Sequence, residues 1–239
     1  MSVWEPIDAQ GRVRRWEYAV GASGRANAVA VELRAGELLL LSPPGPKGSD
    51  EALAALDEHG EVAAIVAPNG FHRGGLPAAT ERYPSAGVYA DPRAAARVGE
   101  RCARGTTVRP LTALTERLPD DVELFVPEHM KRPDVVMRVA VDEGLLWSLT
   151  DIVLNLEALP PGPIERRLFA LMGFRPGLAV NYVGSRLVLL GRGRSAYSAW
   201  LCAELRRRPP ALLITGHGPP VRDPEALREL PALVAAGMA

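Results

Sequence analysis

Short apolar runs open the sequence and predict a group of β-strands. Residues 13–20, 28–33 and 37–41 each have the length of a strand, and they either alternate apolar with polar positions or are largely apolar. Three prolines then fall within 42–46, where they predict a rigid loop because proline cannot continue the hydrogen bonds of a strand. The first part of the chain is therefore expected to consist mainly of strands.

Later segments alternate between strand-length apolar runs and amphipathic stretches. Strands are expected at 62–66, 87–90, 122–126, 135–141, 145–149 and 211–214, and helices at 49–59, 76–83, 164–172, 195–207 and 223–236. A further helix is expected after Asp91, which suits an N-cap, with Pro92 at the first helical position. This order predicts an α/β protein in which two sheets pack together with helices outside them. We find no repeat, linker or boundary, so residues 1–239 are expected to form a single domain.

The composition argues against several classes of function. The chain has 28 basic and 28 acidic residues, and this balance gives no basic excess of the kind that binds nucleic acid. No apolar run reaches the length of a membrane span, and residues 1–18 lack the apolar core of a signal peptide. Cys102 and Cys202 are the only cysteines and form no disulfide framework, so we expect a cytoplasmic protein. The near absence of lysine among the basic residues is typical of a GC-rich, bacterial-like genome.

Three histidines and one aspartate share a position just beyond a predicted strand. His72 follows the strand at 62–66, His129 follows 122–126, Asp151 follows 145–149 and His217 follows 211–214. Loops at strand ends commonly carry functional residues because a rigid sheet fixes their positions. Imidazole and carboxylate groups together suit zinc, iron or manganese. Spacing alone leaves each residue open between metal ligand and ordinary loop residue.

The order of these residues resembles the metallo-β-lactamase superfamily. In that family a strand leads into His-x-His-x-Asp-His-x-Gly-Gly, a single histidine follows later, and two further strands end in Gly-Asp and Gly-His. Here residues 67–75, 126–129, 146–151 and 214–218 fall on these four motifs, and the match extends over about residues 26–220. A branch with Pro-Asn-x-x-His and Thr-Asp in these motifs is the most similar. The resemblance implies a four-layer αββα sandwich.

Several residues of the family's metal-binding motif are replaced in this sequence. Ala67 and Asn69 stand where the family has its first two histidines, and Phe71 stands where it has the aspartate that helps to orient the attacking water. By resemblance, the first of the two metal sites keeps only His129 and the bridging Asp151. That is too few ligands for a tight zinc site. Asn69 itself is expected to form a turn.

The second metal site keeps more of its ligands. The resemblance implies that His72, Asp151 and His217 hold one divalent ion, zinc first, with iron or manganese as alternatives and the absence of any ion as another. Their ligand atoms are then expected to lie within roughly 3–5 Å of one another. His129 is expected nearby, as a fourth ligand or a proton shuttle. The competing interpretations make His72 and His217 turn residues and Asp151 an N-cap.

Three functions follow from these alternatives. The leading hypothesis is a mononuclear metal-dependent hydrolase that acts on an ester, thioester, amide or phosphoester of a small-molecule substrate, with His72, Asp151 and His217 as its catalytic residues. The second is a non-catalytic descendant that binds a small molecule or a protein in the old cleft. The third is a non-haem iron redox protein. Arg73 and Arg132 flank the expected pocket, where they either pair with an anionic substrate or are simply solvated.

Overall fold

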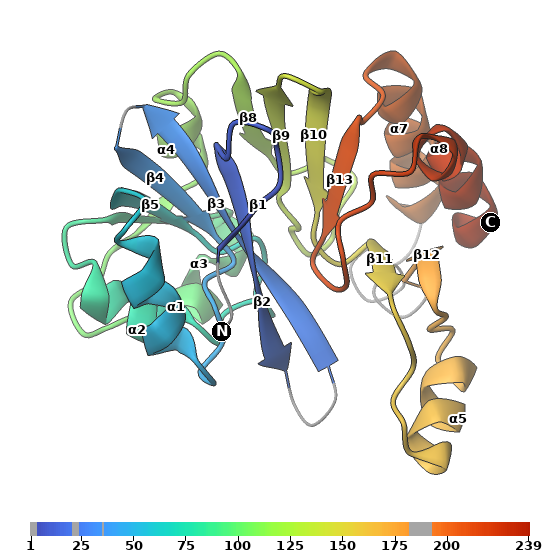
Figure 1. The fold of residues 1–239 in the computed structure, drawn as a ribbon, viewed down its shortest axis with the longest axis horizontal. Helices are drawn as coiled ribbons and strands as arrows, with labels where there is room; N and C mark the ends of the chain where they lie inside the picture. The colour runs from blue at the N-terminus through green and yellow to red at the C-terminus, as the bar shows by residue number, and fades with distance from the viewer. Residues whose placement is uncertain (1–3, 21–23, 35, 182–192) are drawn as a thin grey trace.

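Two β-sheets pack face to face and carry helices on their outer sides (Figure 1). The computed structural model describes residues 4–20, 24–34, 36–181 and 193–239. Along the first sheet the strands are β1 (Glu5–Pro6), β2 (Val13–Val20), β3 (Gly24–Arg34), β4 (Glu37–Leu41), β5 (Glu61–Val66), β6 (Gly87–Ala90) and β7 (Val108–Pro110). The second sheet has the order β13 (Leu212–Thr215), β10 (Gly144–Leu149), β9 (Val136–Val141) and β8 (Val122–Phe125).

The described helices either cover the outer face of a sheet or connect strands. They are α1 (Ser49–Leu56), α2 (Leu76–Arg82), α3 (Pro92–Gly99), α4 (Thr112–Thr115), α5 (Pro163–Leu171), α7 (Gly193–Arg207) and α8 (Pro224–Met238). Strands β4 to β7 run parallel, and α1, α2 and α3 each connect one of these strands to the next. A separate pair, β11 (Val153–Leu156) and β12 (Gly177–Val180), lies beside α5, which projects from the body of the molecule.

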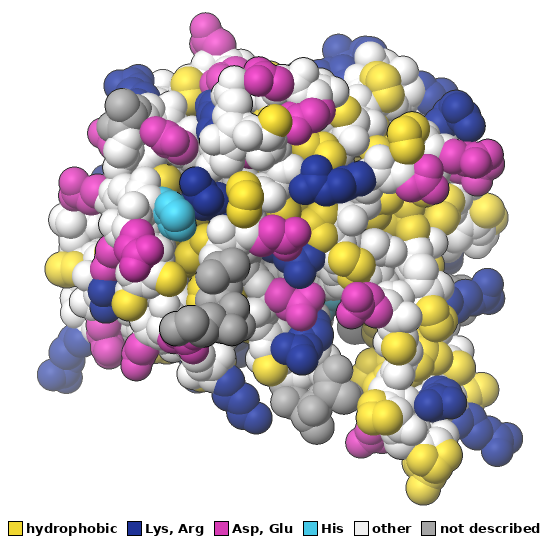
Figure 2. Space-filling view, viewed as in Figure 1, with side chains coloured by type: hydrophobic (Ala, Val, Ile, Leu, Met, Phe, Trp, Pro, Cys, Tyr) yellow, Lys and Arg dark blue, Asp and Glu magenta, His cyan; other side chains and the backbone are white. Residues whose placement is uncertain are grey.

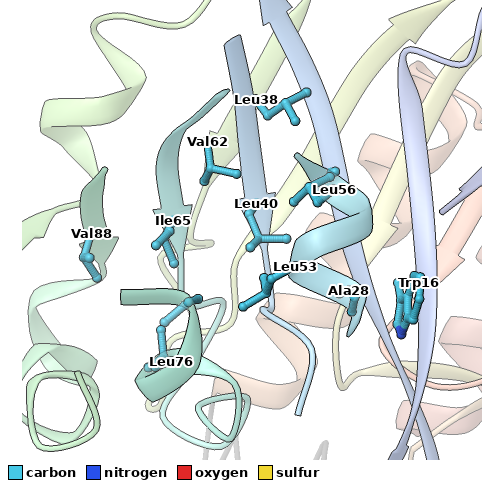
Figure 3. Packing of buried hydrophobic residues seen from close by; sticks show 14 of the residues in the cluster. Trp16, Ala28, Leu38, Leu40, Leu53, Leu56, Val62, Ile65, Leu76 and Val88 are labelled. Atoms are coloured by element: carbon cyan, nitrogen blue, oxygen red, sulfur yellow. The ribbon is translucent and has the colours of Figure 1, made fainter. Parts of the chain in front are cut away.

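The first sheet is buried on both faces, which explains its unbroken apolar runs. In β4, Leu38 and Leu40 pack against the α1–α3 side (Figure 3). Leu39 and Leu41 pack against the second sheet. Successive strand side chains point to opposite faces, so a run of leucines serves two cores at once. A third core joins the second sheet to α7 and α8. Helices, sheet, sheet and helices make the four-layer αββα sandwich that the sequence predicted, and the α/β class is confirmed.

Most of the predicted elements are found close to their expected bounds. Asp91 caps α3 as expected, because its side chain accepts a hydrogen bond from the backbone N–H of Arg93. The sequence prediction omitted β1, β7, β11, β12 and α4, each of which has four residues or fewer. Within the described ranges, no helix is long and apolar enough to span a membrane.

Candidate metal centre

The second sheet places Asp151 and His217 side by side. Strands β10 and β13 are parallel neighbours in which Leu149 is paired with Thr215. Asp151 and His217 each stand two positions beyond that pair, so both loops leave the sheet at the same edge. His72 comes from the first sheet, in the loop that follows β5. The candidate site therefore lies where the ends of the two sheets meet.

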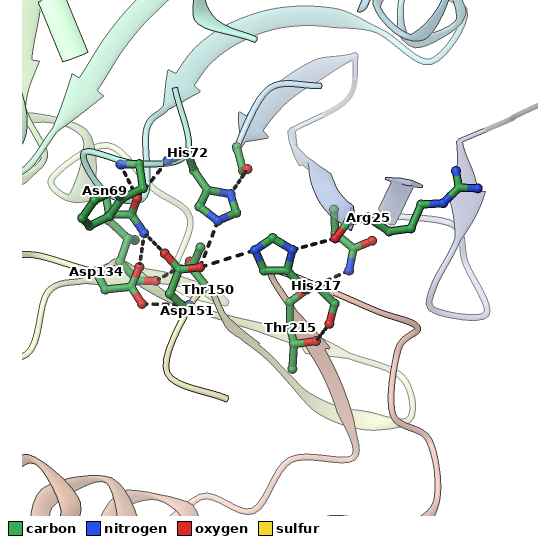
Figure 4. A network of polar contacts seen from close by, with 12 residues as sticks. Arg25, Asn69, His72, Asp134, Thr150, Asp151, Thr215 and His217 are labelled. Atoms are coloured by element: carbon green, nitrogen blue, oxygen red, sulfur yellow. Dashed lines mark hydrogen bonds and ion pairs between the residues drawn. The ribbon is translucent and has the colours of Figure 1, made fainter. Parts of the chain in front are cut away.

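The side chains of these three residues converge on one oxygen atom (Figure 4). Nε2 of His72 lies 3.0 Å from Oδ1 of Asp151, and Nε2 of His217 lies 3.6 Å from the same oxygen. One ligand atom from each residue fits within a 4.8 Å span, which confirms the expected convergence. His129 is exposed and is not part of this group, so its assignment as a fourth ligand stays a prediction.

The far nitrogen of each imidazole has its own hydrogen-bond partner. Nδ1 of His217 lies 2.6 Å from the backbone oxygen of Arg25, and Nδ1 of His72 lies 2.9 Å from Oγ of Ser42. A carbonyl oxygen can only accept, so Nδ1 of His217 carries the proton, and in the neutral ring Nε2 presents a lone pair. That lone pair faces the carboxylate of Asp151, an arrangement that is repulsive unless a proton or a metal ion lies between them.

Asn69 joins the His72 loop to the Asp151 loop. Its Oδ1 accepts hydrogen bonds from the backbone N–H groups of Phe71 and His72, at 2.8 and 2.9 Å. These bonds confirm the turn-forming role that the sequence predicted. Its Nδ2 donates to Oδ2 of Asp151 at 2.7 Å and to Oδ1 of Asp134 at 2.9 Å, which the sequence did not reveal. The buried amide therefore uses all of its hydrogen-bonding capacity within the site.

Asp134 is a buried carboxylate that the sequence analysis did not single out. Besides the bond from Asn69, its Oδ2 accepts a hydrogen bond of 3.0 Å from the backbone N–H of Asp151. Asp134 stands two residues before strand β9, and an acidic residue at the start of a buried run was the one signal in the sequence. Burial and the neighbouring charge of Asp151 raise the pKa of Asp134 to about 7.

The pKa values of the two carboxylates in the cluster shift in opposite directions. Burial alone would raise the pKa of Asp151, but the charges and hydrogen bonds of His72 and His217 outweigh burial and hold that pKa well below its usual range. Burial would also lower the pKa of His72, yet the carboxylate of Asp151 raises it overall. Asp151 is thus the anionic centre of the cluster, and a cation of some kind is favoured beside it.

Glycines on either side of His217 allow its loop to pack closely against the backbone of residues 150–155. A Cβ at Gly216 would lie 2.4 Å from the backbone oxygen of Thr150, and one at Gly218 would lie 1.5 Å from that of Asn155. Gly218 also has a φ of +91°, a conformation that residues with a side chain rarely adopt. In the His72 loop, a Cβ at Gly75 would lie 2.0 Å from the backbone oxygen of Pro44. The glycines of two motifs therefore serve close backbone packing.

A cleft of about 730 Å³ opens above the cluster. His72, Asp151 and His217 all line it. Its other lining residues are mostly apolar or small, and they include Tyr18, Ala19, Val20, Ala26, Gly45, Pro46, Lys47, Phe71 and Gly74. The three polar groups therefore lie in a largely apolar cavity of a size that suits a small-molecule ligand.

Comparison with known proteins finds likeness in structure but not in sequence. No family model and no curated protein matches the sequence. The DIM-1 metallo-β-lactamase has a TM-score of 0.58 at 14% identity over 94% of each chain, and a metallo-β-lactamase from Pontibacter korlensis has 0.55 at 13% over 93% of this chain and 94% of its own. The Flv1 flavodiiron core from Synechocystis has 0.57 at 14%, over 95% of this chain and 58% of its own. At such identities the likeness concerns the fold.

Proposed function

We propose that this chain, which has the fold of the metallo-β-lactamase superfamily, is a hydrolase that uses a single divalent metal ion. His72, Asp151 and His217 would hold the ion, with zinc as the first choice. When bound, a divalent ion supplies a Lewis acid and lowers the pKa of water, as hydrolysis of an ester, thioester, amide or phosphoester requires. The protein would bind the substrate in the cleft and keep it in a fixed orientation.

The observation that carries this proposal is the geometry of the three side chains. Ligand atoms of one tetrahedral zinc ion lie roughly 3.3 Å apart when each bond is about 2.0–2.1 Å. The two separations from Oδ1 of Asp151, 3.0 and 3.6 Å, are close to that value. The outer hydrogen bonds of His72 and His217 supply the second layer of support that metal-binding histidines usually have.

The hydrogen bonds of Asn69 favour one ion over two. In a binuclear site the later aspartate bridges both ions, which requires both of its oxygens or a shared one. Here Oδ2 of Asp151 accepts from Nδ2 of Asn69, so only Oδ1 faces the histidines. Ala67, at the position of a family histidine, has no donor atom at all. A second ion would therefore have to compete with Asn69 for Oδ2 of Asp151 and would lack the imidazole that the family has at position 67.

Metal content tests the proposal directly. Protein that is purified without a histidine tag and dialysed against zinc is expected to bind one ion per chain by elemental analysis. The His217→Ala variant should retain almost none, because two ligands are too few for a tight zinc site. The His129→Ala variant is the matched control and should keep most of the ion. Two ions in the unmodified protein, or equal losses in the two variants, would contradict the proposed ligand set.

We also expect the protein to be a poor β-lactamase. Phe71 cannot orient or deprotonate a water molecule, and catalysis by a positioned acid or base contributes about 10²–10⁴-fold to a rate. Hydrolysis of a chromogenic cephalosporin should therefore be slower by a factor in this range than that of a binuclear metallo-β-lactamase assayed alongside. The Phe71→Asp variant should recover part of the rate, and Phe71→Leu should recover none. A rate equal to that of the comparison enzyme would count against this interpretation of Phe71.

A second candidate function is a non-catalytic binding protein. It is favoured by the direct contact between His72 and Asp151 and by the amide of Asn69. Both oxygens of Asp151 therefore already have hydrogen-bond partners within the chain. If the metal-replete protein carries no ion, this becomes the better account. If iron is the ion that copurifies and it changes oxidation state, the redox alternative replaces the hydrolase.

A further inference from the structure

Exposed apolar side chains gather in two places on the described surface. Five large hydrophobic residues there are more than 40% exposed, and two of them, Val20 and Phe71, line the cleft above the cluster. The other three lie on α5, the arm at the lower right of Figure 2. Exposed apolar groups at the mouth of a cleft are characteristic of a ligand-binding surface. The ligand of this cleft therefore has an apolar part.

Two guanidinium groups surround the ring of Phe71. Cζ of Arg97 lies 5.3 Å from the ring centroid, and Cζ of Arg132 lies 5.5 Å from it. Within the described ranges, neither arginine forms an ion pair with an acidic residue. Each makes a cation–π contact with this ring. Both charges therefore remain available beside Phe71, which itself lines the cleft.

Arg97, and not Arg73, lies over Phe71 together with Arg132. The sequence suggested Arg73, but its guanidinium group donates to the backbone oxygen of Arg97 and pairs with Glu100 at 3.4 Å. Arg97 lies on α3. Its side chain passes alongside Gly70, where a Cβ would lie 3.5 Å from its Cδ. Arg97 therefore packs against the backbone turn that carries Phe71.

The cleft itself holds little free negative charge. Lys47 lines the cavity, and among its described lining residues Asp151 is the only carboxylate. That carboxylate is already engaged by His72 and Asn69. The whole chain has a formal net charge of zero, so a local excess of unpaired cations is a property of this place and not of the protein in general.

We propose that Arg97 and Arg132 form a subsite for a phosphate group of the substrate, beside the apolar wall of Phe71 and Val20. This inference rests on the proposed function, and it narrows the substrate to a compound that carries both an apolar part and a phosphate group. Guanidinium groups match the oxygens of phosphate by forming paired hydrogen bonds. Two cations also attract a phosphate dianion more strongly than they attract a singly charged carboxylate.

Binding of small probes to the metal-free protein tests the subsite separately from the metal. After removal of metal with a chelator, the full chain is titrated calorimetrically with phenyl phosphate, benzoate and phenol. Phenyl phosphate should bind best and phenol should show no measurable binding. Arg97→Ala and Arg132→Ala should each weaken phenyl phosphate binding about tenfold or more, since each loses a charge-assisted hydrogen bond. Arg101→Ala removes one exposed arginine nearby and should change binding less than twofold.

Each outcome of this titration decides one claim. Equal losses in all three variants, or no binding of phenyl phosphate to the unmodified protein, would overturn the subsite. Benzoate binding as tight as that of phenyl phosphate, with the same dependence on the two arginines, would overturn the assignment to phosphate. A protein that binds phenyl phosphate through these arginines but takes up no zinc would contradict the proposed hydrolase and support the subsite. Circular dichroism of each variant checks that it remains folded.

Discussion

Replacing Asn69 with alanine is expected to lower the free energy of unfolding by about 3–5 kcal/mol, as buried polar groups left without partners do. The change leaves an oxygen of Asp151 and an oxygen of Asp134 without their shared donor. It also leaves the backbone N–H groups of Phe71 and His72 without their acceptor. Asp151 then becomes free to turn, so bound zinc should fall as well. Chemical denaturation and elemental analysis of the same preparation measure the two effects.

Asn155 provides the control for this substitution. Its Nδ2 makes a single hydrogen bond, of 2.8 Å, to the backbone oxygen of Pro219. Asn155→Ala should therefore cost about 1 kcal/mol, the usual contribution of one such bond. If Asn69→Ala costs no more than Asn155→Ala, the amide of Asn69 does not hold the two loops together, and the argument for a single ion loses its support.

Replacing Gly218 with alanine is expected to lower the free energy of unfolding by more than about 3 kcal/mol, since overpacking and backbone strain add. The new Cβ would lie 1.5 Å from the backbone oxygen of Asn155, a separation that no side-chain rotation relieves. The loop that carries His217 must therefore move away from β11. Metal binding should fall together with stability, because His217 moves with its loop.

Gly105 separates the steric effect from the effect of backbone conformation. Its φ of +86° is nearly that of Gly218, but no atom lies within 4 Å of the place where a Cβ would be. Gly105→Ala should therefore show only the cost of a left-handed residue, about 1–2 kcal/mol. Similar losses of stability in the two variants, measured by denaturant unfolding, would mean that close packing of the His217 loop is not what the glycine provides.

The layers of the fold could be predicted because burial on both faces leaves a strong mark on the sequence. The run at 37–41 is recognisable as a strand since four consecutive leucines can be buried only between two cores. The short strands β7 and β11 have no such mark, because β7 contains Arg109 and Pro110, and Asn155 interrupts the apolar residues of β11. Their positions depend on neighbours that are distant in sequence.

The candidate site could be predicted only in part. His72, Asp151 and His217 stood out because each follows a strand and the order of motifs resembles a known family. The amide contacts of Asn69 join loops from different sheets and leave no trace in local sequence. The burial of Asp134 is signalled only by its place at the start of an apolar run. Arg97 is one of many exposed helix arginines until the fold places it beside Phe71.

The seam between the two sheets is held closed at the candidate site by the chain itself. Asn69 and His72 bond across it to Asp151, and Asn27 of β3 donates to the backbone oxygens of Thr215 and Gly218. If an ion binds there as proposed, the stability that it adds depends on its own affinity and concentration. Folding is then expected to precede metal uptake and not to require it. A chain synthesised without metal would then fold in the metal-free state, and it could bind and release an ion repeatedly without unfolding.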